Sequence, residues 1–313
     1  MKAEDRILKP GQMETPAEEI HFLFLPARDL FSRRAERFRF LSHNYPLGDY
    51  MAFLALLADA QQKLLNQFPE LPLPGPDQYA MCFQHGMPLL AAHSWPRNPI
   101  WRWGLNVILG HMKQAALPSA ASETVTSLEK GNEVGLEEKA DRILAGDLAD
   151  ISPQELPFVA AALQVYWVHM ATSLGESAFG RLEQGALCPV CGSYPCAGIV
   201  NVTGARQGLR YLSCSLCASQ WHMVRIKCST CGSTHGIDYY ILEGSNGSVK
   251  AESCDDCNFY LKLLYLGKGT RMEAMADDLA TLALDMLMDN KGKKRRGPNL
   301  FFHPGSHAAS GAT

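Results

Sequence analysis

Apolar residues recur at the spacing of a helix through the first 185 residues of the chain. From this pattern, helices are predicted at residues 17–40, 48–68, 99–116, 136–149 and 153–184, with Asp49 as the N-cap of the second. The proline-rich residues 71–76 and the small, polar residues 118–135 break the pattern and are predicted to be connections. The first half of the chain is therefore predicted to be an all-α helical domain.

One of these predicted helices has almost no polar face. Residues 156–175 carry no formal charge over a length that suffices to cross a bilayer. Gln164, His169 and Thr172 are spread along the segment, however, and Pro157 lies near its start. These polar positions favour a helix that is buried on most sides at the centre of a soluble bundle.

The pattern changes at Gly185, where short stretches rich in β-branched and aromatic residues replace the helical period. Strands are predicted at residues 197–202, 208–212, 221–226, 238–243 and 260–265. A last helix is predicted within residues 268–290, with its apolar face formed by Met275, Leu279, Leu282 and Met286. The residues that follow, 291–313, are predicted to be a mostly disordered tail.

Nine of the ten cysteines lie in this β-rich half, and eight of them form four C-x-x-C pairs. The pairs make two copies of the pattern C-x2-C-x22-C-x2-C, offset by 40 residues. Because the repeat assigns each pair a partner, the first predicted metal site is Cys188, Cys191, Cys214 and Cys217. The second predicted site is Cys228, Cys231, Cys254 and Cys257. Four thiolates in this arrangement form a tetrahedral site that takes zinc or iron equally well.

The sequence therefore predicts an α+β multidomain chain. The all-α domain covers residues 1–185, and two tandem small β metal modules of the rubredoxin-like or zinc-ribbon-like type cover 186–226 and 227–267. The C-terminal helix (268–290) and the tail (291–313) complete the chain. A module of this size has little core of its own, so a structural role of each ion is the simplest interpretation. A closed site offers no open coordination position, and Lewis-acid hydrolysis is not expected.

Composition and charge narrow the functional classes. The hydrophobic fraction of 47% is that of a globular protein, and the net charge of −3 gives no general attraction to nucleic acid or acidic membranes. The start of the chain is too charged for a signal peptide, so a cytoplasmic location without membrane insertion is expected. The arginine-rich segment 32–38 lacks the apolar stretch of an export signal and is predicted to be an exposed helix face. No catalytic constellation stands out, and a non-enzymatic role is expected.

The cysteine pairs are embedded in longer motifs, which lie at Leu187–Ser193, Arg210–Cys217, Trp221–Cys228, Ala251–Cys257, Tyr260–Lys262, Met275–Leu282 and Gly297–Phe302. These motifs resemble the FdhE family of formate dehydrogenase accessory proteins, and all four C-x-x-C pairs of that family are in place. The resemblance implies rubredoxin-like iron sites at the eight cysteines, with zinc able to replace iron. It also implies a cytoplasmic maturation factor that binds the catalytic subunit of a respiratory formate dehydrogenase before export and is not itself the dehydrogenase. Cys196 is an extra thiol without an implied role.

Two alternatives remain open, and a homo-oligomer is compatible with each. A zinc-ribbon module that binds nucleic acid or protein would use a basic stripe near the cysteines, formed by Arg206, Arg210, Arg225 and Lys227. Asp255 and Asp256 lie inside one cysteine pair and would repel phosphate, so nucleic-acid binding is not expected. The other alternative is an iron–thiolate electron carrier that acts on the partner enzyme.

Overall fold

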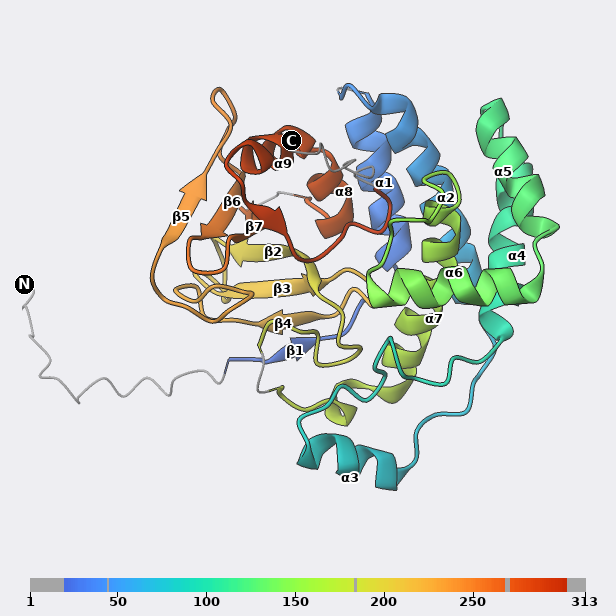
Figure 1. Ribbon diagram of the computed structural model, residues 1–313, viewed down its shortest axis with the longest axis horizontal. Helices are drawn as coiled ribbons and strands as arrows, with labels where there is room; N and C mark the ends of the chain where they lie inside the picture. Colours follow the sequence, from blue (N-terminus) through green and yellow to red (C-terminus); the bar gives the residue numbers. More distant parts are fainter. Residues whose placement is uncertain (1–19, 44, 183–184, 268–270, 303–313) are drawn as a thin grey trace, which may run out of the picture.

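The computed structural model describes residues 20–43, 45–182, 185–267 and 271–302. The helices of the first half lie on one side and a mixed β-sheet lies on the other, as Figure 1 shows. The predicted α+β class is confirmed, because N-terminal helices are followed by a β-rich region with two four-cysteine clusters and by C-terminal helices.

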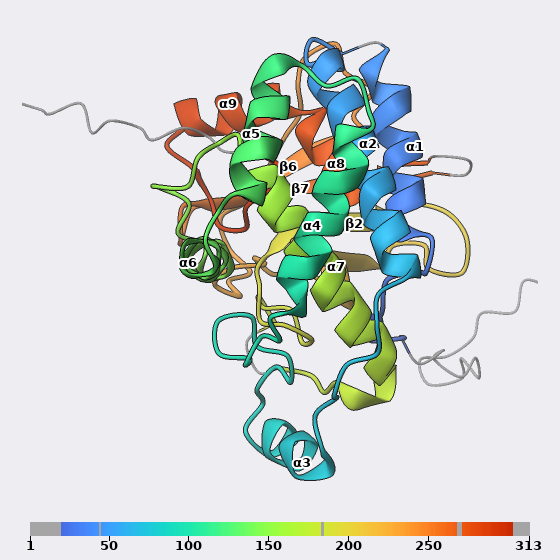
Figure 2. The ribbon, with the colours of Figure 1, turned by 90° about the vertical axis from the view of Figure 1, so that its right-hand side faces the viewer.

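The described part of the first half consists mainly of α1 (Leu30–Ser42), α2 (Gly48–Asn66), α3 (Pro76–Gln84), α4 (Ile100–Lys113), α5 (Ser119–Glu129), α6 (Glu133–Ala145) and α7 (Leu156–Leu174). Helix α7 is buried along nearly its whole length and packs against α2, α4 and α6. Figure 2 shows α2, α4 and α7 side by side and α3 standing apart from them. No helix in the described ranges combines the length and apolar character that a membrane crossing requires. The central buried helix predicted from residues 156–175 is therefore present.

Several predicted elements of the helical half differ from the structure. Residues 20–29 are not helical and contain the short strand β1 (Leu23–Phe24), so only the later part of the helix predicted at 17–40 is found. Helix α2 begins at Gly48 with Leu47 as its N-cap, and Asp49 instead lies in the first turn, where its charge favours the helix dipole.

Two helices, α3 and α5, lie in segments for which no helix was predicted. Residues 118–135 were predicted to be a loop, but α5 and the start of α6 occupy them. Polar residues do not prevent this helix, because the Thr124 hydroxyl donates to the carbonyl of Ala120, while Val125 and Leu128 bury one face. Helix α3 was not predicted, since none of its residues is buried and it has no apolar stripe facing the core.

The second half builds one mixed sheet from β2 (Pro195–Asn201), β3 (Arg210–Cys214), β4 (Gln220–His222), β5 (Ile237–Tyr240), β6 (Val249–Cys254), β7 (Phe259–Leu266) and β8 (Lys294–Arg295). The strand order is β1-β4-β3-β2-β7-β6-β5, with β8 added beside β7. Each cysteine repeat contributes an antiparallel set, and the parallel pairing of β2 with β7 joins the two sets. The two repeats therefore share one sheet. Strand β6 was missed because polar Lys250 and Glu252 interrupt its apolar residues.

The C-terminal segment is more broken and more ordered than predicted. The single helix expected at 268–290 is two, α8 (Ala274–Leu279) and α9 (Leu282–Asn290). Thr281 lies at the break, and its hydroxyl donates to carbonyls of the preceding turn. As a result Met275 and Leu279 are buried, whereas Met286 is exposed. Residues 291–302, expected in a disordered tail, include β8 and the buried Phe301. The rest of that tail, 303–313, lies outside the described residues.

Buried ion pairs connect the C-terminal segment to the sheet. Lys262 of β7 is fully buried and lies 2.9 Å from a carboxylate oxygen of Asp278 and 2.5 Å from one of Asp285. Arg295 lies 2.8 Å from the same Asp278 carboxylate. Burial alone would raise the pKa of Asp278, but Arg295 and Lys262 outweigh it and hold the pKa below its usual range.

Two further ion pairs join α1 to α8. Arg34 contacts Glu273 at 3.0 Å, and Arg37 contacts Asp277 at 2.5 Å. The prediction that residues 32–38 form an exposed face is wrong for Arg34, whose side chain is only 2% exposed. Its charge is matched by Glu273, which no local pattern could reveal, because it lies far along the chain.

Candidate metal centres

Each C-x-x-C pair is held on a tight turn. The residue directly after each pair has a positive φ, and these residues are Gly192, Ala218, Gly232 and Asn258. In the first pair of each repeat, the turn is closed by N–H donation from the glycine to the first cysteine's carbonyl, at 2.8 Å for Gly192 and 3.1 Å for Gly232. Glycine adopts this backbone conformation without strain, so the sequence C-x-x-C-G in the first pair of each repeat suits the turn.

The turns bring the eight sulfur atoms together as two groups, and in each group all sulfur atoms lie within 4.8 Å of one another. The first quartet is Cys188, Cys191, Cys214 and Cys217, and the second quartet is Cys228, Cys231, Cys254 and Cys257. The membership of each group is the one that the repeat assigned. The structure contains no disulfide among the described cysteines.

The spacing of the sulfur atoms fits a tetrahedral ion. In the first quartet, Sγ···Sγ distances are 3.5 Å for Cys188–Cys217 and 3.4 Å for Cys191–Cys214. In the second quartet, the two corresponding distances are both 3.7 Å. Four sulfur atoms bonded at about 2.3 Å to one ion lie about 3.8 Å apart, whereas a disulfide is about 2.05 Å long. The donor set and its size therefore suit zinc or iron.

The electrostatics of the first quartet also favour a cation. Burial raises the pKa of Cys188 and of Cys214. Burial opposes ionisation of Cys191 as well, but hydrogen bonds from the neighbouring thiols outweigh it and lower the pKa of Cys191. The protein alone thus favours ionisation of Cys191 over that of Cys188 and Cys214. A bound cation would let Cys188 and Cys214 ionise as well, so binding is expected to release protons.

Backbone groups support the sulfur atoms in both quartets. The N–H of Leu216 points to Cys214 Sγ at 3.4 Å, and the N–H of Thr230 points to Cys228 Sγ at 3.3 Å. Such donors stabilise negative charge on a metal-binding thiolate. The two repeats differ in which cysteine pair receives this N–H donation. It is the second pair in the first quartet and the first pair in the second quartet.

The two quartets differ in exposure. All four cysteines of the first quartet are buried, whereas Cys231 of the second is exposed and Cys257 is half-buried. Cys196 belongs to neither quartet, is buried, and has a pKa that burial raises to about 12. The candidate metal groups among the described residues contain no histidine, acidic residue or Cys196.

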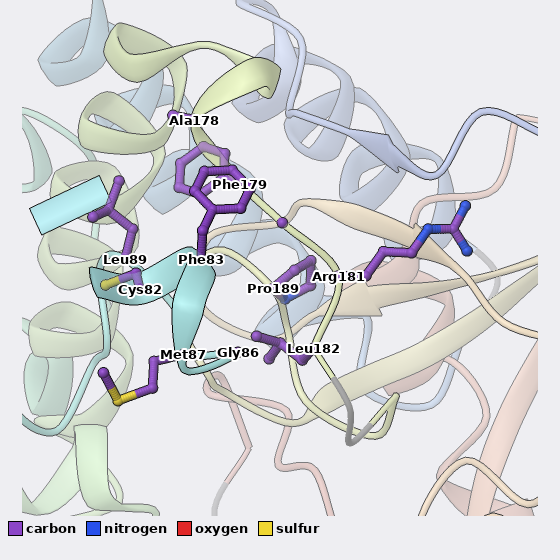
Figure 3. A pocket seen from close by; sticks show the side chains of 11 residues that line it. Cys82, Phe83, Gly86, Met87, Leu89, Ala178, Phe179, Arg181, Leu182 and Pro189 are labelled. Carbon is purple, nitrogen blue, oxygen red and sulfur yellow. The ribbon is translucent and has the colours of Figure 1, made fainter. Parts of the chain in front are cut away.

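A shallow apolar hollow lies beside the first quartet, between α3 and the segment that follows α7 (Figure 3). Phe83 of α3 and Phe179 line it, and Pro189 reaches it from inside the first cysteine pair. The lining residues also include Cys82 and Arg181, but no histidine and no carboxylate.

The side chain of Arg210 does not lie on the surface, where the sequence predicted it. Arg210 was grouped with a surface stripe, but its side chain is fully buried and pairs with Glu252 at 2.6 Å. Arg206 lies over the ring of Phe24. The stripe is therefore interrupted, because one of its four cations is neutralised inside the protein. Neither Arg210 nor Glu252 carries a local signal of this pairing, since they lie on β3 and β6 of different repeats.

Comparison with known proteins gives a consistent result. The family models for the FdhE N-terminal, central and C-terminal domains match residues 20–183, 187–225 and 226–302. The protein FdhE homolog of Enterobacter sp. (strain 638) is 42% identical, over 90% of this chain and 91% of its own. The protein FdhE of Escherichia coli (strain K12 / DH10B) is 41% identical, with the same coverage. The crystal structure of the FdhE protein from Pseudomonas aeruginosa superposes with a TM-score of 0.83 at 40% identity, covering 91% of this chain and 100% of that one.

Proposed function

The chain belongs to the FdhE family, and we propose that it is an accessory protein for the maturation of a respiratory formate dehydrogenase. The observation that carries the proposal is the pair of cysteine quartets of tetrahedral size, set within a chain that matches the family along nearly its whole length. The protein binds the catalytic subunit of the dehydrogenase in the cytoplasm, before export, and does not itself oxidise formate.

The eight quartet cysteines are the ligands of two ions, and the ion in the working protein is iron. Zinc fits the same four sulfur atoms and replaces iron when it is the more available ion. The sulfur distances, the buried position of most of these cysteines and the N–H groups aimed at Cys214 and Cys228 support metal binding at both quartets. Anaerobic purification followed by elemental analysis should give two ions per chain and a ferric-thiolate visible spectrum after oxidation.

Deletion of the gene tests the accessory role. Formate-dependent dye reduction should be lost in the deletion strain and restored by the wild-type gene. Cys228→Ser should fail to restore it, whereas Cys196→Ser, which alters a buried thiol outside both quartets, should succeed. Full dye reduction in the deletion strain would refute the accessory role.

A second experiment tests the partner. The tagged protein, purified under anaerobic conditions, should retain the catalytic subunit of formate dehydrogenase on the resin. The tagged Cys196→Ser variant is the matched control, because it changes a cysteine outside both quartets and should retain the catalytic subunit as the wild type does. A wild-type protein that retains no catalytic subunit, in a strain whose dehydrogenase depends on it, would refute direct binding and leave an indirect role.

One alternative is favoured by a specific observation. The second quartet reaches the surface at Cys231, which would allow electron transfer to a partner's cofactor or thiols. An iron–thiolate carrier predicts that the visible spectrum bleaches and returns reversibly on reduction and oxidation. A colourless protein that is fully active with zinc alone would exclude this role.

A further inference from the structure

We propose that the two quartets differ in how readily they exchange their ions. The first quartet retains its ion and fastens the helical half to the sheet. The second quartet exchanges its ion with external thiolate ligands through Cys231. This inference rests on the metal binding proposed above, and it assigns different roles to two sites that the sequence repeat makes look alike.

The helical half encloses the first pair of the first quartet. The N–H groups of Leu90 and Ala92 donate to the carbonyls of Val190 and Cys191, at 3.0 and 2.8 Å. Trp167 of α7 holds this contact in place, because its indole N–H donates to the carbonyl of Leu90 at 2.9 Å. The turn of Cys188–Cys191 is therefore covered by chain from the helical half, which leaves no sulfur atom accessible.

The second pair of the first quartet is fixed by Gln164, which also comes from α7. Its side-chain amide N–H donates to the carbonyl of Ser215, between Cys214 and Cys217, at 2.9 Å. Its side-chain carbonyl accepts from Arg34 at 3.0 Å and from Gln61 at 3.2 Å. Displacing this cysteine pair would leave the buried amide N–H of Gln164 and the carbonyl of Ser215 without each other as partners, while Arg34 and Gln61 hold Gln164 in place.

The second quartet has no comparable cover. Within the described ranges, the hydrogen bonds of its two turns are local or go to the C-terminal segment, and none reaches the helical half. Lys293 is the main outside contact, donating to the carbonyl of Cys254 at 3.2 Å and pairing with Asp255 at 2.6 Å. Strand β5, beside this quartet, lies on the side of the sheet away from α1–α7 (Figure 1).

Exposure of a ligand residue decides which ion is removed more readily. An incoming thiolate has to approach the ion while one protein sulfur leaves, so at least one ligand has to be accessible from outside. Cys231 meets this condition and no cysteine of the first quartet does. One external thiolate replaces the Cys231 thiolate, so the charge around the ion is conserved and no oxidant or reductant is consumed. The ligand class is a soft donor, such as a small thiol or a partner's cysteine.

A chelator challenge tests the difference. The full-length protein is loaded with zinc, which does not change redox state, and its ion content is measured before a chromogenic chelator is added. Two release phases of equal amplitude are expected. Cys231→Ser should alter or remove the fast phase and leave the slow rate unchanged. Gln164→Met should speed the slow phase by about tenfold while the fast rate stays the same, and Trp167→Phe provides a second variant if Gln164→Met does not fold.

The controls separate failure of the inference from failure of the proposed function. Cys196→Ser, outside both quartets, should change neither phase. A loaded protein with two ions that are released in one phase would overturn the inference, as would a fast phase that persists unchanged in Cys231→Ser. A wild-type chain that never holds two ions would instead overturn the metal binding on which the proposed function depends.

Discussion

The buried pair of Arg210 and Glu252 gives the sharpest stability prediction, because it links the two cysteine repeats. Arg210 of β3 is fully buried, and its guanidinium donates to Glu252 of β6 at 2.6 Å. It also donates to the carbonyls of Val224 and Lys227, at 2.6 and 2.7 Å, just before the second quartet begins. In Arg210→Leu, the Glu252 carboxylate keeps only the hydroxyl of Tyr239 as a side-chain donor in the described structure. Removing one partner of a buried pair costs about 3–5 kcal/mol of unfolding free energy.

Urea denaturation of the metal-loaded protein measures this loss, with near-UV and far-UV circular dichroism followed together. The double variant Arg210→Leu/Glu252→Leu removes both charges and should recover much of the stability, because no unpaired charge remains buried. Arg225→Leu, which removes an exposed arginine from the neighbouring loop, should change the unfolding free energy by about 0.5 kcal/mol or less. A loss below about 1 kcal/mol in Arg210→Leu, as in an exposed pair, would refute the reasoning. Additive losses in the double variant would refute it as well.

Three further predictions concern other parts of the molecule. Cys228→Ser should release one of two ions and loosen residues 227–267, at a cost of several kcal/mol; unchanged ion content and protease resistance would show that the quartet is wrongly assigned. Burial lowers the pKa of His169, so the folded chain takes up a proton less readily than the unfolded chain, and stability falls as pH drops below about 6.5. His169→Gln should therefore show a smaller loss of urea midpoint between about pH 7 and 5, and equal losses would contradict this. Gly297→Ala should destabilise the protein by about 1–3 kcal/mol in a thermal melt, because its new methyl group would clash with the backbone carbonyl of Pro195, whereas Gly110→Ala in open space should be harmless by the same measurement.

The sequence predicted those features that depend on neighbours along the chain. Helices α2 and α4 have apolar periodicity and were placed within a few residues. Helix α7 was recognised from its long uncharged apolar run, but the helix predicted at 153–184 extends well beyond its end at Leu174. The membership of each quartet could be read because the two cysteines of one turn are close in sequence and the repeat supplies the rest. Helix α5 escaped prediction, because a short helix with one narrow buried face resembles a polar loop in composition.

Features that depend on distant partners could not be predicted. The parallel pairing of β2 with β7 joins two repeats that the spacing alone describes as separate. Arg34 and Arg210 looked like surface charges, and their partners, Glu273 and Glu252, lie far along the chain. The difference in exposure between the quartets has the same origin. Identical spacing gives two similar sulfur cages, but only the first is covered by Gln164 and the Leu90 segment.

The edge of the sheet has a consequence for how the protein is made. Leu23 of β1 pairs with Trp221 of β4, so one of the first segments to leave the ribosome has to wait for one of the later ones. Until translation has passed β4, β1 has no strand to join, and until it has passed β7, β2 lacks its parallel neighbour. Long-range pairing of this kind is slow and leaves unpaired strand edges exposed while synthesis continues. The nascent chain should therefore be most vulnerable to aggregation and proteolysis while β1 and β2 have emerged and β4 and β7 have not.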